Sequence, residues 1–230
     1  MIKVLNNWLE IGEANKFLNK KRLPKHPTPE KNRDLYQLYN IIEFMPRNIR
    51  IIDLGCGELH VLKFLYALGF KNLYGVDLLI GWKERLVQLI KMLKEHSLSP
   101  PFHLFKGNIT KTKFPAQFFD LGICISTIEH GVNLEEFLNE SYRILKIGGL
   151  LFITTDYWEE DINIVNNNKP FGLSWKVFSK KDIKQFIELS YDIGFSLYKN
   201  SSIPNCSEQC VIWNNQEYTF ICIVLKKEKK

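Results

Sequence analysis

The sequence predicts an α/β protein with a mostly parallel sheet, helices on both faces and an antiparallel last strand. Three observations support this fold class. Short apolar segments alternate with helical patterns from residue 50 onward, and a glycine-rich turn follows the first apolar segment. The last two apolar segments have no helical pattern between them. Alternating strands and helices favour a parallel sheet, whereas two strands that follow each other directly pair antiparallel.

The first 47 residues predict a helical extension to a main domain that covers residues 48–230. Two helical stripes of apolar residues flank residues 23–29, where three prolines require an extended backbone. Thr28 is the expected N-cap of the second helix. We expect this extension to lie over the functional site as a lid, with His26 and Arg33 as anion contacts.

The expected elements of the main domain follow in a regular order. Strands are predicted at residues 50–54, 73–78, 102–105, 119–126 and 150–155, and helices at 59–68, 82–95 and 134–145. A last helix at 179–191 begins with Ser179 as its N-cap and Asp182 three residues later, as in a capping box. Strands at 194–198 and 218–225 complete the sheet. The segments 157–177 and 200–217 are long loops, which often carry function.

Composition and charge exclude several classes of protein. The chain has 230 residues, of which 45% are apolar and 24% charged, as in ordinary globular domains. No apolar run reaches the roughly 18 residues of a membrane span, and we expect a cytoplasmic protein without membrane insertion. The net charge of +6 lies partly in residues 20–22 and 226–230, which are typical of solvated clusters. The five cysteines suit reduced thiols, and no Cys/His grouping indicates zinc.

The stretch Ile51-Ile-Asp-Leu-Gly-Cys-Gly-Glu-Leu-His60 predicts the turn between the first strand and the first helix. Glycines allow a sharp turn and let backbone amides approach a ligand, while the next helix directs its positive end at an anion. Asp77 ends the second strand at the spacing at which an acid binds ribose hydroxyls. His60 stands where a dinucleotide-binding turn has its third glycine, which disfavours NAD and FAD.

Four motifs in this order resemble the class I S-adenosylmethionine-dependent methyltransferases. Asp53 to Gly57 is similar to the first family motif, Asp/Glu-x-Gly-x-Gly-x-Gly, and Asp77 to the ribose-binding acid. Gly107-Asn-Ile109 matches the adenine-contacting position, and Tyr142-Arg-Ile-Leu-Lys-Ile-Gly-Gly-Leu-Leu-Phe-Ile153 matches the helix, Lys-Pro-Gly-Gly turn and fifth strand. The resemblance covers about residues 48–226 and implies a Rossmann-like, seven-stranded sheet. Leu59 replaces the last motif glycine, and we expect it to displace the first helix slightly.

The resemblance implies S-adenosylmethionine as the cofactor. A Rossmann-like domain that has lost its cofactor is the alternative. The implied cofactor contacts lie at the carboxyl ends of the strands, and they are Asp53, Gly55, Cys56, Gly57, Asp77, Leu78, Asn108, Ile109 and Ser126.

Two residues after the fourth strand are candidates for acid–base chemistry. Methyl transfer mainly needs alignment of donor and acceptor, but an oxygen or nitrogen acceptor also loses a proton to a base. His130, with Glu129 beside it, is the candidate base; His130 could instead orient the loop. The pair resembles the Glu-x-x-Glu-His of metal-assisted methyltransferases, but Ser126 replaces the first Glu. Too few oxygen ligands remain for a hard cation such as magnesium, and no metal site is expected.

The loop after the fifth strand predicts the acceptor site. Asp156, Tyr157, Trp158 and Trp175 combine aromatic rings with a carboxylate, which commonly binds a sugar ring. These residues could equally form the loop's own small core. Their motifs resemble bacterial methyltransferases associated with surface-polysaccharide gene sets. We therefore expect O-methylation of a small polar or sugar-type molecule, such as a nucleotide-linked metabolite.

Other acceptors and functions remain open at this stage. Ser99-Pro-Pro-Phe102 spells a motif of nucleic-acid amino-methyltransferases, but it precedes the third strand instead of following the fourth. DNA is therefore not expected as a partner. Methylation of RNA or protein is one alternative, and a catalytically silent cofactor-binding or regulatory domain is another. The sequence leaves a homo-oligomer open.

Overall fold

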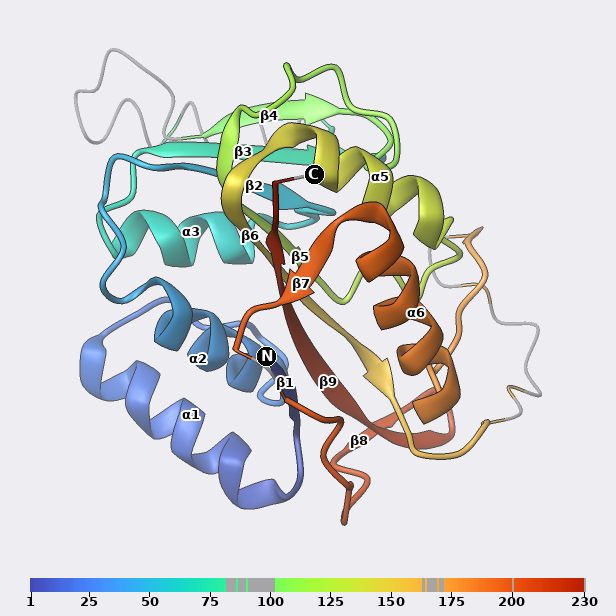
Figure 1. The fold of residues 1–230 in the computed structure, drawn as a ribbon. Coiled ribbons are helices and arrows are strands. Elements are labelled where there is room, and N and C mark those ends of the chain that lie inside the picture. The colour runs from blue at the N-terminus through green and yellow to red at the C-terminus, as the bar shows by residue number, and fades with distance from the viewer. Residues whose placement is uncertain are drawn as a thin grey trace.

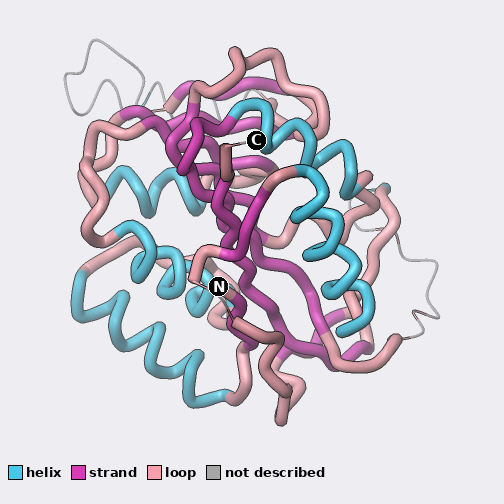
Figure 2. The backbone as a smooth tube through the Cα atoms, viewed as in Figure 1, coloured by secondary structure: helices cyan, strands magenta, loops and turns pink. Residues whose placement is uncertain are grey.

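The computed structural model describes residues 1–81, 86, 90, 102–162, 164, 169, 172–199 and 201–229. One central sheet runs through the molecule, with α1, α2 and α3 on one face and α5 and α6 on the other (Figures 1 and 2). Its strands follow the order β1-β9-β6-β5-β2-β3-β4, and β7 and β8 also pair with β9. The predicted α/β class with a mostly parallel sheet is confirmed.

The elements have the following bounds. The strands are β1 Ile2–Val4, β2 Arg50–Leu54, β3 Asn72–Asp77, β4 His103–Lys106, β5 Phe119–Ile125, β6 Leu145–Tyr157, β7 Phe195–Leu197, β8 Val211–Trp213 and β9 Gln216–Lys227. The helices are α1 Trp8–Lys21, α2 Lys31–Ile42, α3 His60–Ala67, α5 Leu134–Ile144 and α6 Lys180–Ile193. The predicted helix at 82–95 falls outside the described residues, apart from Leu86 and Ile90.

The strands β2 to β6 pair in parallel and separate two apolar layers. Along β2 the side chains alternate, so that Ile51 belongs to the layer with α2 and α3, and Ile52 to the layer with α5 and α6. Both isoleucines are fully buried. This two-sided burial explains why the strands are continuous apolar runs in the sequence.

The antiparallel end of the sheet contains two strands more than expected, β1 and β8. β9 pairs antiparallel with β6 along one edge and with two short strands, β1 and β7, along the other. The predicted antiparallel pairing of the last two strands, β7 and β9, is confirmed. β1 covers the edge at Ile2↔Ile223, and β7 covers it at Phe195↔Lys227. No strand was expected within residues 1–47, because three residues are too few to show a strand period. The long edge of β9 is thereby paired along most of its length, which removes exposed backbone donors and acceptors.

Two helix starts give opposite outcomes. Ser179 caps α6: its hydroxyl accepts from the Asp182 amide at 3.3 Å, and the Asp182 carboxylate accepts from the Ser179 amide at 2.9 Å. The predicted capping box is confirmed. The prediction of Thr28 as the cap of α2 is wrong, because the helix begins at Lys31 after Glu30, which has helical dihedral angles and no side-chain cap. Thr28 contributes only its carbonyl, which accepts from the Lys31 amide at 3.2 Å.

The start of β6 also differs from the prediction. The strand begins at Leu145, directly after α5, instead of at Leu150. Its register against β5 shifts from Phe119↔Leu145 to Leu121↔Leu150, so residues 146–149 bulge out of the ladder. Gly148, with φ of +79°, accommodates this bulge.

Candidate active site

The glycine turn after β2 holds three strand ends together. The amides of Gly55 and Cys56 both donate to the Val76 carbonyl of β3, at 2.8 and 3.2 Å. Gly55 has φ of +90°, and a Cβ atom there would overlap the side chain of Thr127, which follows β5. Cys56 is buried, with its thiol against Gly75. Only glycine fits at position 55, because both the dihedral angle and the close approach require it.

Leu59, where the family motif has glycine, has a left-handed backbone. Its φ and ψ are 66° and 21°, in the left-handed region that leucine rarely adopts. Its side chain is 1% exposed and packs in the apolar layer next to α3. The helix begins at the next residue, and the expected displacement of that helix stays a prediction.

Asp77 links the glycine turn to the end of β3. Its carboxylate accepts from the Gly57 amide at 3.0 Å and from the Leu79 amide at 2.8 Å. Leu78, between them, is about half exposed. These bonds fix the carboxylate beside the turn, and its contact with a ribose stays a prediction.

Asp53 lies beneath this turn as a buried acid. Burial, and then the charge of Asp77, raise the pKa of Asp53 to about 8. Its Oδ2 is buried and has no hydrogen-bond partner among the described residues. A buried carboxylate oxygen of this kind fits a polar group that a bound cofactor would bring.

Asn108 and Ile109 follow β4 on the next strand end. The Gly107 amide donates to the Asp77 carbonyl at 3.0 Å, which places this loop beside the end of β3. Asn108 is exposed, and its side-chain oxygen accepts from the Thr110 amide at 2.9 Å. Ile109 is 6% exposed and packs in the core below. The predicted cofactor residues thus come together on neighbouring strand ends.

Ser126 meets a lysine that the sequence did not single out. Ser126 has φ of +49°, and its amide donates to the Thr154 carbonyl at 2.9 Å. Its hydroxyl accepts from the ammonium group of Lys31, the first residue of α2. The same ammonium lies 4.2 Å from the centre of the Phe220 ring. Lys31 was missed because nothing in the sequence distinguishes it from the many lysines that lie in solvent.

Three buried carboxylates gather around the ends of β5 and β6. Asp34, Glu129 and Asp156 are 0%, 2% and 4% exposed. The Thr154 hydroxyl donates to Asp34 at 3.1 Å, and the Thr155 hydroxyl donates to Glu129 at 3.0 Å. The Trp175 indole donates to Asp156 at 2.8 Å.

Burial is the main cause of the altered acidity of these groups. It raises the pKa of Asp34 to about 6, and it raises the pKa values of Glu129 and Asp156 as well. Lys31 opposes the rise in all three. Asp34, like Lys31, belongs to the N-terminal extension and was not predicted as part of the site.

His130 follows Glu129 in the same tight turn. Its amide donates to the Thr127 carbonyl at 3.1 Å, and its ring is half-buried. Desolvation, and then the charge of Lys31, lower the pKa of His130 to about 4. The imidazole is therefore neutral and weakly basic at pH 7, whereas Glu129 is the stronger base of the two once it is ionised.

The aromatic residues of the predicted acceptor site are largely buried. Tyr157 is fully buried within β6, and Trp175 is 8% exposed. Trp158 is partly buried, and its amide donates to the Phe178 carbonyl at 3.0 Å. The ring of Trp175 lies edge-on to Trp213 at 4.8 Å. Trp175 and Trp158 pack in a small core under the loop, whereas Tyr157 packs in the layer with α5 and α6, and contact of these residues with an acceptor stays a prediction.

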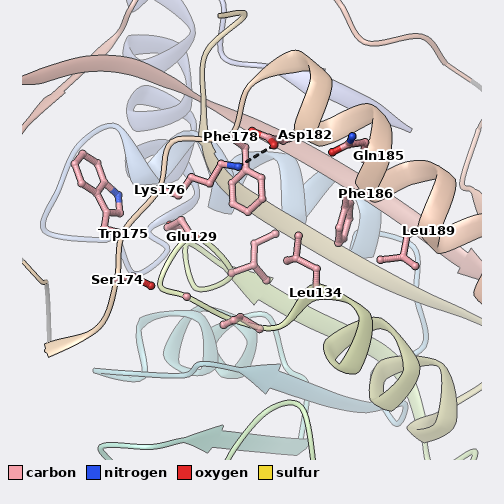
Figure 3. A pocket seen from close by; sticks show the side chains of 13 residues that line it. Glu129, Leu134, Ser174, Trp175, Lys176, Phe178, Asp182, Gln185, Phe186 and Leu189 are labelled. Carbon is pink, nitrogen blue, oxygen red and sulfur yellow. Dashed lines mark hydrogen bonds and ion pairs between the residues drawn. The ribbon is translucent and has the colours of Figure 1, made fainter. Parts of the chain in front are cut away.

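A hollow of about 540 Å³ lies beside this loop, between the turn after β5 and the first half of α6 (Figure 3). Its walls are mostly apolar, and the Lys176–Asp182 ion pair of 2.8 Å lies on its rim. The glycine turn and Asp77 do not line it, so the hollow is separate from the predicted cofactor contacts. The lining residues include Ile128, Glu129, Val132, Leu134, Ser174, Phe178, Gln185, Phe186 and Leu189.

The N-terminal extension reaches the site through residues other than those predicted. Arg33 is 1% exposed, and it donates to the Val4 carbonyl at 2.7 Å and pairs with Glu10 at 3.3 Å. It is therefore not an anion contact, and that prediction is wrong. His26 lies against His60, with 4.6 Å between the ring centres. Desolvation, and then His60, lower the pKa of His26 to about 4, so its ring is neutral at pH 7.

Two kinds of feature are absent from the described residues. No group of three or more His, Cys, Asp or Glu side chains there has the arrangement of a metal site. Within the same residues, no helix is both long and apolar enough to cross a membrane.

The central part of the chain is similar to known proteins. Residues 52–153 match the protein family described as "Methyltransferase domain". The ubiquinone biosynthesis O-methyltransferase of Pelagibacter ubique is 24% identical over 165 residues, covering 68% of this chain and 63% of that protein. The 25S rRNA (adenine(645)-N(1))-methyltransferase of Schizosaccharomyces pombe is 29% identical over 107 residues, 46% of this chain. The chain spans only 27% of the length of that second relative.

Solved structures share the fold at low identity. A 1,6-didemethyltoxoflavin-N1-methyltransferase of Burkholderia thailandensis, solved with S-adenosylhomocysteine, has a TM-score of 0.64 at 12% identity, covering 95% of this chain and 87% of its own. The [4+2]-cyclase SpnF has a TM-score of 0.61 at 13% identity, covering 87% and 83%. The match over residues 52–153 and the shared fold support an S-adenosylmethionine-dependent methyltransferase.

Proposed function

We propose that this protein transfers a methyl group from S-adenosylmethionine to a hydroxyl of a small polar or sugar-type molecule. The observation that carries the proposal is the position of a buried carboxylate, Glu129, beside Ser126 at the strand ends. The glycine turn and Asp77 lie on the neighbouring strands. A base is needed when an oxygen acceptor loses its proton, and a carboxylate in an apolar setting is a strong enough base for this.

The cofactor fits the residues at the glycine turn. Asp77 would hold the ribose hydroxyls, Asn108 and Ile109 the adenine, and the turn at Gly55 and Gly57 the methionine part. The buried oxygen of Asp53 supports this fit, because it has no hydrogen-bond partner in the described part of the chain. When bound, S-adenosylmethionine supplies an electrophilic methyl group on a sulfonium. The residues of this chain then orient the acceptor hydroxyl and remove its proton, with Glu129 as the base and His130 orienting the turn.

The N-terminal segment favours a small acceptor over RNA or protein. Lys31 contacts Ser126 and His26 contacts His60, so residues 26–31 lie across the ends of the strands. A macromolecule would need this segment to move, whereas a small molecule needs only a passage beside it. We place the acceptor among nucleotide-linked or surface-polysaccharide precursors in the cytoplasm, on the resemblance of the Thr127–Gly131 and Thr154–Trp158 motifs.

Calorimetry with S-adenosylmethionine is the first test. Wild-type protein should bind the cofactor, and Asp77→Ala should weaken binding about tenfold or more, because it removes an ionised acceptor of hydrogen bonds. Absence of binding at about 1 mM cofactor would contradict the enzymatic function.

A screen with labelled cofactor then identifies the acceptor. Sugar nucleotides, phosphorylated small molecules and RNA are the three arms, and transfer to RNA alone would overturn the small-molecule proposal. Glu129→Gln should abolish transfer and keep cofactor binding. Glu135→Gln, an exposed acid on the first turn of α5, is the matched control and should keep both.

A further inference from the structure

We propose that Lys31 is a positioning residue that supplies the counter-charge for the buried carboxylates around Glu129. The N-terminal extension would then be a working part of the active site and not only its cover. The inference rests on the proposed function, since it concerns the base of that reaction.

Three buried acids from three elements lie around the end of β6, where Asp34 and Glu129 are bonded to adjacent strand residues whose side chains point to opposite faces of the sheet. Asp34 comes from α2, Glu129 from the turn after β5 and Asp156 from the end of β6. Their hydrogen-bond donors at Thr154, Thr155 and Trp175 are all neutral groups. Neutral donors stabilise an ionised carboxylate but do not balance its charge, and an unbalanced buried charge is costly.

Lys31 brings a positive charge to this region from α2. Its ammonium is anchored by the Ser126 hydroxyl and by the face of the Phe220 ring at 4.2 Å. Its charge acts on Asp34, Glu129 and Asp156 alike. Arg33, the next cation along α2, acts on Asp34 but is held by Glu10 and the Val4 carbonyl.

The other titratable groups that face Glu129 do not replace this charge. Asp156 from β6 raises the pKa of Glu129 further, in the same direction as burial. The thiol of Cys124 on β5 and the phenol of Tyr218 on β9 remain neutral, because burial raises the pKa of both. His130 is neutral at pH 7, as shown above. Lys31 is thus the group that favours the ionised form of Glu129, the form that can accept a proton.

Titration of Glu129 in the intact protein tests this role without an acceptor. The ¹³C resonance of its carboxyl carbon is followed against pH in the cofactor-free protein, and the spectrum of Glu129→Gln identifies the resonance. Lys31→Met should raise the titration midpoint by about one pH unit, the lower end of the effect of a nearby opposite charge. Lys31→Arg should restore most of the wild-type value. Lys20→Met, an exposed lysine of α1, is the matched control and should leave the midpoint unchanged.

Ser126→Ala provides a second variant that keeps the lysine but removes its anchor. It should shift the midpoint in the same direction by a smaller amount. An unchanged midpoint in folded Lys31→Met would overturn the proposal; if that variant does not fold, an unchanged midpoint in Ser126→Ala would do so. Failure of cofactor binding would contradict the proposed function, whereas the titration reports on Lys31 independently.

Discussion

Leu59 shows two opposing effects at one residue. Its left-handed backbone costs a leucine about 1–2 kcal/mol relative to glycine. Its buried side chain contributes more than this, since removal of a buried leucine costs about 2–5 kcal/mol. The energy gained by burying the side chain therefore exceeds the backbone cost, which explains how the turn keeps a leucine where the family motif has glycine.

A pair of substitutions at this residue separates the two effects. Leu59→Gly and Leu59→Ala both lose the buried side chain, but only glycine relieves the backbone. We expect the free energy of unfolding of Leu59→Gly to be about 1 kcal/mol higher than that of Leu59→Ala, measured by urea denaturation. At Leu65, inside α3, the same pair should show the opposite order, because alanine is the better helix former. If the glycine variant were the more stable of the pair at both positions, or at neither, the backbone argument would be contradicted.

At the residue scale, local motifs predicted the cofactor side of the site but not the whole acceptor side. Asp53, Asp77 and Asn108 stand in short motifs next to strand ends, so position along the chain sufficed to bring them together. Lys31 and Asp34 reach the site only through the packing of α2, which joins them to residues about 95 and 120 positions further along. Contacts between residues so far apart in the sequence produce no local motif from which they could be predicted.

At the element scale, the strongest predictions were those with side-chain chemistry at a boundary. The capping box at Ser179 could be read from four residues. The hairpin between β8 and β9 was missed, although Asn214 and Asn215 both have positive φ and asparagine pairs are a known hairpin signal. β1 was missed because three residues carry no period.

The two helix starts give a direct test at this scale. Ser179→Ala should lower the free energy of unfolding by about 1 kcal/mol, because it removes the hydroxyl that accepts from the Asp182 amide and donates to its carboxylate. Thr28→Ala should change it by less than about 0.3 kcal/mol, since Thr28 contributes only its backbone carbonyl to α2. Thermal and urea unfolding of both variants give the comparison. An equal loss in the two variants would contradict the observed start of α2.

At the scale of the whole molecule, the extension and the main domain share one apolar core and one sheet. α2 buries Leu35, Leu38 and Ile42 in the apolar layer that also contains Ile51 and α3. β1 adds a strand to β9 at the edge of the sheet. The predicted boundary at residue 47 stays a prediction, but the contacts across it are those of one core.

Removal of the extension should therefore do more than open the site. A chain that begins at residue 48 should lose cooperative thermal unfolding and expose apolar surface, because one face of the sheet loses its cover. Circular dichroism and binding of an apolar dye measure both effects. Adding residues 1–47 as a separate polypeptide should partly restore cooperative unfolding and cover part of the exposed apolar surface. A sharp transition at the wild-type temperature would instead identify the extension as a separable lid.

The pairing of β1 with β9 has a consequence for the order in which the protein is made. Ile2 leaves the ribosome some 220 residues before its partner Ile223 is synthesised. β1 therefore stays without its pairing strand while the residues between them are synthesised, and the edge of the sheet can close only after β9 has emerged. Contacts between such distant segments slow folding. We infer that the last strand acts as the closing step, after which α2 and its lysine are fixed over the strand ends.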